Sequence, residues 1–184
     1  TMGQTFWVTG PETEMNSFTF YIRDGSSAVE FETYVYAWDS DDSHVTGDAL
    51  FSSGPLFTTD NYGQQGFEAV TVDTGSLSLN ENSRYIAFLS VSNISSGSFD
   101  QADVASVSSS SSLPNPYSSG RFFFKNNGTN FDGIYNQWNH QGPNDAAFEM
   151  TFSAPSSPVP EPATITLLGL GIAGLIARGR RSAA

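Results

Sequence analysis

Before residue 163, hydrophobic and polar positions alternate in short runs, and clusters of turn-forming residues separate the runs. A period of two is typical of β-strands, and many short strands between turns indicate a sandwich or a barrel. We therefore expect an all-β fold, a single antiparallel β-sandwich, jelly-roll-like, over residues 1–153. The expected strands cover residues 5–9, 17–23, 29–38, 49–51, 56–58, 67–73, 84–92, 120–124 and 146–152.

The clearest strand signal lies between residues 31 and 38. Alternation places one set of side chains on one face: Phe31, Thr33, Val35 and Ala37. It places the aromatic set on the other face: Glu32, Tyr34, Tyr36 and Trp38. Two interpretations of the aromatic face are open. It packs on the second sheet, as aromatic residues usually do in a sandwich, or it forms an exposed stacking platform for sugar rings.

The C-terminus departs from this pattern, because residues 163–177 are apolar or small and carry no charge. Proline fits poorly in a helix interior, so Pro160 and Pro162 place the start of a helix after residue 162. As a helix, residues 163–177 span about 22 Å, against about 30 Å for the hydrocarbon core of a bilayer. The sequence thus predicts one C-terminal transmembrane-type helix of marginal length. A basic cluster follows it and would stay cytoplasmic: Arg178, Arg180 and Arg181.

The order Pro160-Glu161-Pro162, apolar helix and arginine cluster closely resembles the PEP-CTERM sorting signal of exported bacterial proteins, over about residues 158–181. The resemblance implies that a membrane protease, exosortase, recognises the Pro-Glu-Pro motif and processes the tail, with the arginines as a retention signal. It also implies transient contact with the inner membrane and then a cell-surface or extracellular location, often in bacteria that make extracellular polysaccharide. A permanent membrane anchor is the alternative.

This resemblance divides the chain into a β-sandwich ectodomain at 1–153, a Pro/Ser linker at 154–160 and a sorting signal at 159–184. Export also requires an N-terminal signal, and residues 1–7 lack the basic and apolar regions of one. We therefore expect a precursor that has lost its start, or a fragment. The order of aromatic runs before residue 153 looks like the β-sandwich ectodomains of other PEP-CTERM proteins, which mostly lack an assigned activity.

Charge excludes one class of partner. All but one of the 19 acidic side chains lie before residue 159, together with four of the seven basic ones, so this part carries a net charge of −14. Such a surface repels nucleic acid. The chain has no cysteine, which excludes a disulfide framework and a thiolate metal site.

The usual catalytic motifs are missing from the sequence. It has no Gly-x-Ser-x-Gly elbow, no His-Glu-x-x-His, no phosphate-binding loop and no dinucleotide fingerprint. Its two histidines lie in expected loops. Glu30 and Glu32 share a strand face, but a solvated edge is the commoner reason for such a pair than glycoside hydrolysis. We expect no enzyme activity.

An acidic loop at residues 39–48 is the best metal candidate. Calcium prefers several oxygen ligands, and Asp39, Asp41 and Asp42 supply carboxylates. The loop lacks the glycine and the final glutamate of an EF-hand, so a solvated acidic hairpin is the alternative. No other cofactor is expected.

A turn-rich segment at residues 126–133 leads to two further aromatic residues. Asparagine, aspartate and aromatic side chains on one loop can hydrogen-bond and stack on a sugar, although they also form ordinary turns. The candidate glycan contacts are Tyr36, Trp38, Tyr135 and Trp138. We expect an exported, non-enzymatic cell-surface or extracellular-matrix protein processed by exosortase. The alternative is a carbohydrate-binding β-sandwich module for exopolysaccharide.

Overall fold

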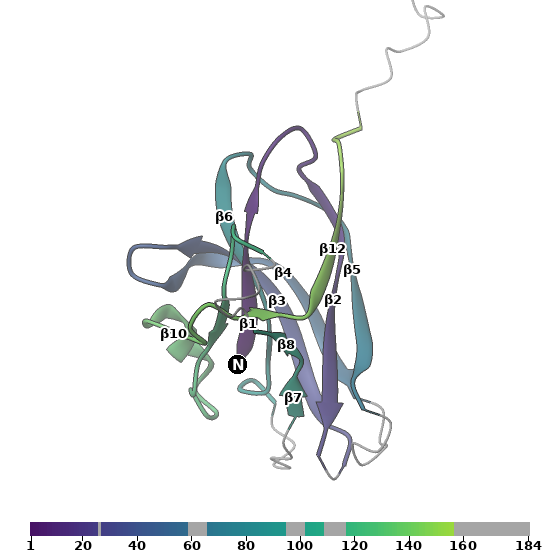
Figure 1. The fold of residues 1–184 in the computed structure, drawn as a ribbon, viewed down its shortest axis with the longest axis vertical. Coiled ribbons are helices and arrows are strands. Elements are labelled where there is room, and N and C mark those ends of the chain that lie inside the picture. The colour runs from purple at the N-terminus through teal and green to yellow at the C-terminus, as the bar shows by residue number, and fades with distance from the viewer. Residues whose placement is uncertain (26, 59–65, 95–101, 109–116, 157–184) are drawn as a thin grey trace, which may run out of the picture.

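The computed structural model describes residues 1–25, 27–58, 66–94, 102–108 and 117–156. Over these residues the chain is built mainly of antiparallel strands (Figure 1), which confirms the all-β expectation. The larger sheet has the strand order β10-β9-β1-β6-β3-β4. Its strands are β1 (Met2–Val8), β3 (Glu30–Asp39), β4 (His44–Phe57), β6 (Ser83–Ser90), β9 (Phe122–Phe124) and β10 (Asn139–His140).

The smaller sheet has the order β12-β2-β5 and lies on the right in Figure 1. Its strands are β2 (Glu14–Asp24), β5 (Glu68–Ser78) and β12 (Phe148–Ser153), and β7 (Ala102–Val104) pairs with the end of β2. A separate two-stranded pair consists of β8 (Ser106–Val107) and β11 (Asp145–Ala146). Ala105 joins this pair to the smaller sheet, because its N–H donates to Tyr21 O and its carbonyl accepts from Ala147 N–H.

The main hydrophobic core lies between the two sheets. Phe6, Phe31 and Val35 enter it from the larger sheet and are at most 2% exposed. Phe18 enters from the smaller sheet and meets Phe51 of β4 edge-on, with ring centroids 6.2 Å apart. The inward positions fall at every second residue, as the alternating sequence pattern requires.

One long strand, β4, replaces the two strands expected at 49–51 and 56–58, and the acidic loop expected at 39–48 shrinks to a short turn. The ladder between β3 and β4 shifts register twice, between Glu32 and Tyr34 and between Val35 and Ala37. Gly47 and Gly54 lie opposite these shifts with φ of 69° and 70°, a backbone conformation that glycine adopts without strain. The turn-forming residues that suggested strand ends therefore form bulges within one strand.

Three short strands and one helix were not expected from the sequence: β7, β8, β10 and the 3₁₀ helix η1 (Phe131–Tyr135). Each has five residues or fewer, which is too short for a period to be read. The strand expected at 146–152 is divided between β11 and β12. The described part of the linker, residues 154–156, has no regular structure.

The sorting motif at 160–162, the apolar stretch at 163–177 and the arginines at 178, 180 and 181 lie outside the described residues. The expected transmembrane-type helix therefore falls in a part of the chain about which the structure says nothing. Over the residues that are described, no helix has the length and apolar character needed to cross a membrane.

Candidate functional site

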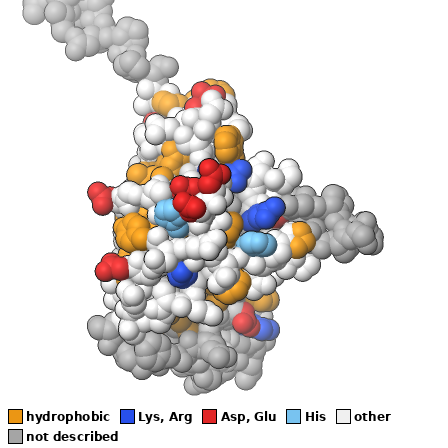
Figure 2. All heavy atoms as spheres, turned by 90° about the vertical axis from the view of Figure 1, so that its left-hand side faces the viewer, with side chains coloured by type: hydrophobic (Ala, Val, Ile, Leu, Met, Phe, Trp, Pro, Cys, Tyr) orange, Lys and Arg blue, Asp and Glu red, His pale blue; other side chains and the backbone are white. Residues whose placement is uncertain are grey.

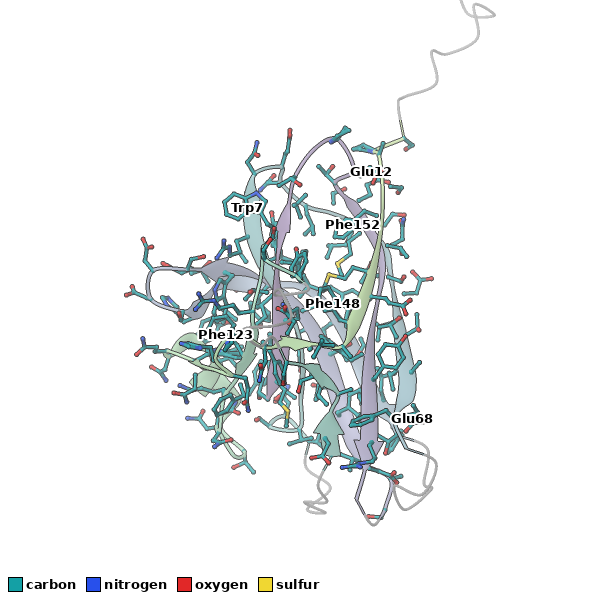
Figure 3. All side chains as sticks on the ribbon, in the orientation of Figure 1. Trp7, Glu12, Glu68, Phe123, Phe148 and Phe152 are labelled. Atoms are coloured by element: carbon teal, nitrogen blue, oxygen red, sulfur yellow. The ribbon has the colours of Figure 1, made fainter. Side chains whose placement is uncertain are left out.

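The outer face of the larger sheet carries a second, aromatic core. Tyr34, Tyr36 and Trp38 project from β3 to this face, beside Ile86 and Phe88 of β6. Phe123 of β9 belongs to this outer core, whereas Phe152 of β12 in the smaller sheet packs against the core between the sheets; both are labelled in Figure 3. The face assignment expected for residues 31–38 is therefore correct.

The aromatic face does not pack on the second sheet, and that part of the expectation is wrong. It is covered by η1 and the segment that follows it. Ring centroids lie 4.8 Å apart for Tyr34 and Phe131, and 5.3 Å apart for Phe88 and Trp138. The Trp138 indole N–H donates to Ile134 O at 2.7 Å, which fixes the ring over the sheet. The cover comes from a segment far along the chain, so no local pattern at β3 could indicate it.

The candidate glycan contacts differ in accessibility. Tyr36, Trp38 and Trp138 are only 4%, 7% and 3% exposed, whereas Tyr135 is 43% exposed. An open stacking platform made of the β3 aromatics is therefore excluded, because stacking on a sugar needs a free ring face. Tyr135 alone among the four candidates presents a large part of its side chain to solvent.

A polar groove of about 500 Å³ lies next to this aromatic core. Its volume is in the range of small-molecule sites, about 300–1,000 Å³. Trp38 and Trp138 form part of its wall, and its polar lining includes Ser40, Ser43, Arg84, Arg121, Gln137 and His140. Figure 2 faces this side of the molecule and shows basic and histidine side chains close to a group of acidic ones.

A close backbone approach builds one wall of the groove. A Cβ atom on Gly120 would lie 1.9 Å from Thr5 O, so only glycine allows the chain to pass here. Thr5 N–H donates to Arg121 O at 3.0 Å, and Arg121 N–H donates to the Thr5 hydroxyl at 2.9 Å. These contacts hold the backbone of Arg121 against β1, where its exposed side chain lines the groove.

The opposite wall is tied to the β3–β4 turn. Trp138 N–H donates to Ser43 O at 2.8 Å, and Gln137 O accepts from Lys125 Nζ at 2.6 Å. His140 Nδ1 accepts from Gly142 N–H at 3.1 Å. Because Nδ1 is an acceptor, the neutral ring carries its proton on Nε2, which remains a donor. The groove thus combines two guanidinium groups, one imidazole donor, hydroxyls and an amide.

A buried polar network lies behind the Gly120 wall. Asp145 is 1% exposed; it accepts from Gln4 Nε2 at 2.9 Å and from Tyr117 N–H at 3.2 Å. Gln4 is fully buried and also accepts from Ala146 N–H at 2.8 Å. Burial raises the pKa of Asp145, and hydrogen bonds from Gln4 and Tyr117 oppose the rise. The network joins β1 and β11 to the segment that leads into the groove wall.

The acidic turn places the candidate metal ligands differently from the expectation. Asp39, Asp42 and His44 bring potential ligand atoms within 4.8 Å of one another, and Asp41 is not among them. Asp39 Oδ1 accepts from Asp41 N–H at 2.8 Å and Asp42 N–H at 3.2 Å. These backbone hydrogen bonds, Asp42 first, lower the pKa of Asp39. The carboxylate thus already stabilises the turn, and calcium binding stays a prediction.

The comparisons with known proteins concern the C-terminal segment. Residues 158–181 match a family model described as the PEP-CTERM protein-sorting motif. The chain ends in a PEP-CTERM sorting signal. This signal indicates an exported protein that is handled at the membrane and processed by an exosortase. Neither the curated proteins nor the solved structures contain a match to the chain.

The PEP-CTERM signal was found from sequence, but the groove was not. The polar groups of the groove come from separate parts of the chain, and no regular spacing in the sequence links them: Arg84, Arg121, Gln137 and His140. The one available signal was the scarcity of cations. Only four basic side chains precede the PEP-CTERM signal, and in so acidic a domain each of them is a candidate binding group for an anion.

Proposed function

We propose that this chain is an exported, non-enzymatic protein that acts at the cell surface or in the extracellular matrix after exosortase removes its tail. The match of residues 158–181 to the PEP-CTERM motif carries the proposal. In this scheme Pro160, Glu161 and Pro162 are recognised by the protease, and the apolar stretch at 163–177 lies in the membrane only until processing. The arginines after it hold the tail on the cytoplasmic side.

The surroundings of the histidines support a binding role over catalysis. A catalytic triad needs a histidine between a nucleophile and an orienting acid. His140 Nδ1 instead accepts from a backbone N–H. His44 stands in the acidic turn beside Asp39 and Asp42, where no hydroxyl nucleophile shares a hydrogen bond with it among the described contacts.

Replacement of Glu161 by alanine tests the processing step. We expect Glu161→Ala to abolish processing and leave the full-length protein in the membrane fraction, because the protease loses the charged centre of its motif. Intact mass and C-terminal peptide mapping of protein from its own cells report the cleavage. Glu12→Ala is the matched control, because it removes an exposed glutamate from the β-sheet domain and leaves the motif intact.

The two variants separate the outcomes. Normal processing of the Glu161→Ala protein would refute exosortase recognition through this motif. If the intact mass of wild-type protein from its own cells still includes Arg181, the tail is a permanent anchor and not a sorting signal. Loss of processing in Glu12→Ala as well would trace the defect to folding of the domain.

A second candidate function is saccharide binding, and the polar groove favours it. Hydroxyl, amide and imidazole groups that line a groove of about 500 Å³ suit the hydroxyls of a sugar. Because Trp38 and Trp138 line the groove, their fluorescence should change when a sugar binds there. Quenching of tryptophan fluorescence by a panel of extracellular polysaccharides tests this function, and no response across the panel would contradict it.

A further inference from the structure

The basic side chains of the domain are unevenly distributed. Of the four that precede residue 159, Arg23 pairs with Asp103 at 2.5 Å and Lys125 donates to a backbone carbonyl. The other two, Arg84 and Arg121, both line the polar groove. Over the described residues neither has a carboxylate within 4 Å. In a protein of net charge −12, two guanidinium groups without a close carboxylate in one groove make a local site for an anion.

Arg84 is held in place for such a role. It projects from β6, opposite Trp7 of β1, and its guanidinium carbon lies 5.0 Å from the centre of the Trp7 ring. Its Nε is buried and has no hydrogen-bond partner within the described structure. A buried donor without a partner is destabilising. A carboxylate can bind a guanidinium group through two parallel hydrogen bonds.

The rest of the groove favours a sugar acid over a bare anion. Ser40, Ser43 and Gln137 offer hydroxyl and amide groups, and His140 offers its Nε2 proton. No aspartate or glutamate lines the groove. Asp39, in the turn beside Ser40, already accepts hydrogen bonds from two backbone N–H groups. Asp145, which attracts Arg121, is 1% exposed. Neutral polar groups would thus surround the ring of a ligand whose charge meets the arginines.

We propose that the groove binds the carboxylate of a uronic acid residue in an acidic saccharide, with Arg84 and Arg121 as the carboxylate-binding pair. The inference rests on the saccharide-binding function proposed above and specifies its substrate class. Nucleic acid is a poor alternative, because the domain carries few cations and a large negative charge. At physiological salt, charges are screened over about 8 Å, so acidic side chains farther away than this oppose the pair only weakly.

The test compares acidic and neutral sugars on the full chain kept in mild detergent. A short oligogalacturonate is titrated by calorimetry, against a neutral glucose oligosaccharide of the same length and against inorganic phosphate. We expect binding of the oligogalacturonate alone. Arg84→Gln and Arg121→Gln should each weaken it at least ~10-fold, since each removes a charge-assisted hydrogen bond worth about 1.5–3 kcal/mol. Arg23→Gln is the matched control, because that arginine is paired outside the groove, and it should leave binding unchanged.

Each other outcome overturns the proposal. Equal binding of the neutral oligosaccharide would show a sugar site without an acid requirement, and equal binding of phosphate would show a general anion site. Equal weakening by Arg23→Gln would show non-specific attraction. Arg121→Gln changes an exposed side chain, so it keeps the test valid if Arg84→Gln lowers the melting temperature. Failure here leaves the sorting function standing, because processing is read separately from the Glu161→Ala protein.

Discussion

The two faces of the larger sheet are covered in different ways, and the difference separates stability from recognition. The inner face meets another sheet, and its apolar side chains pack with those of that sheet in one core. The outer face meets η1 and the segment through Trp138, which cover only part of it. The polar groove lies beside this cover. Coverage by a short segment thus leaves a polar groove at its side, whereas the cavity of about 400 Å³ on the sheet-covered face is lined largely by apolar residues, among them Ile22, Phe31 and Leu89.

The largest effect should come from the inner face. Phe31→Ala removes a ring that is 1% exposed and should lower the free energy of unfolding by about 3–5 kcal/mol, through lost burial and the cavity left behind. Phe57→Ala makes the same chemical change at a side chain that is 64% exposed and should stay within about 0.5 kcal/mol. Denaturant unfolding measures both. Equal losses would mean that the space between the sheets is not the main core.

A substitution in the groove wall should have the second largest effect on stability. Gly120→Ala places a methyl group against the Thr5 carbonyl, which is backbone and cannot rotate away as a side chain could. The substitution should lower the free energy of unfolding by about 1–3 kcal/mol. Ser119→Ala, next to it, adds no atom and should be close to neutral. Unfolding experiments give the cost, and hydrogen exchange at the Thr5 and Arg121 amides shows whether the wall has moved. An unchanged Gly120→Ala protein would show that this close approach is not required.

The smallest expected effect is on the pH dependence of stability, which should differ between a buried carboxylate and an exposed one. Burial raises the pKa of Asp145, so its contribution to stability is complete below the ordinary aspartate pKa and is lost as pH rises through the raised value. Hydrogen bonds lower the pKa of Asp39, so its contribution is complete above the ordinary pKa and is lost as pH falls through the lowered value.

Unfolding free energies of wild type, Asp145→Asn and Asp39→Asn between pH 3 and pH 7 measure the two slopes. The difference between wild type and Asp145→Asn should shrink as pH rises. The difference between wild type and Asp39→Asn should grow. Slopes of the same sign would show that the two carboxylates do not differ in environment as described.

The comparison of the two faces also explains which features the sequence could predict. Alternation assigned Tyr34, Tyr36 and Trp38 to one face of β3 correctly, because the direction of side chains along a strand is a local property. It could not tell what covers that face, because the cover arrives with η1, almost one hundred residues later. Gly47 and Gly54 show the same limit of local patterns. A glycine is found in a bulge as readily as at a strand end, so its presence does not predict where β4 ends.

The two candidate sites differ in the same way. The PEP-CTERM signal is contiguous, so its residues could be identified by order alone. The groove is assembled from β1, β3, β6 and the segments around Gly120 and Gln137. The residues that line the groove come together only when the strands have paired, and their spacing in the sequence does not predict this pairing. The candidate calcium ligands were adjacent in sequence, yet the turn engages Asp39 with its own backbone.

The end of β12 sets how far the domain stands from a membrane during processing. The strand ends at Ser153, and seven residues lead from there to Pro160. A fully extended chain covers at most about 3.3–3.6 Å per residue, so this tether reaches about 25 Å. Electrostatic screening at physiological salt acts over about 8 Å. The greatest reach of the tether is thus about three screening lengths, which is enough to keep a strongly acidic domain clear of anionic headgroups while its tail is held by the protease.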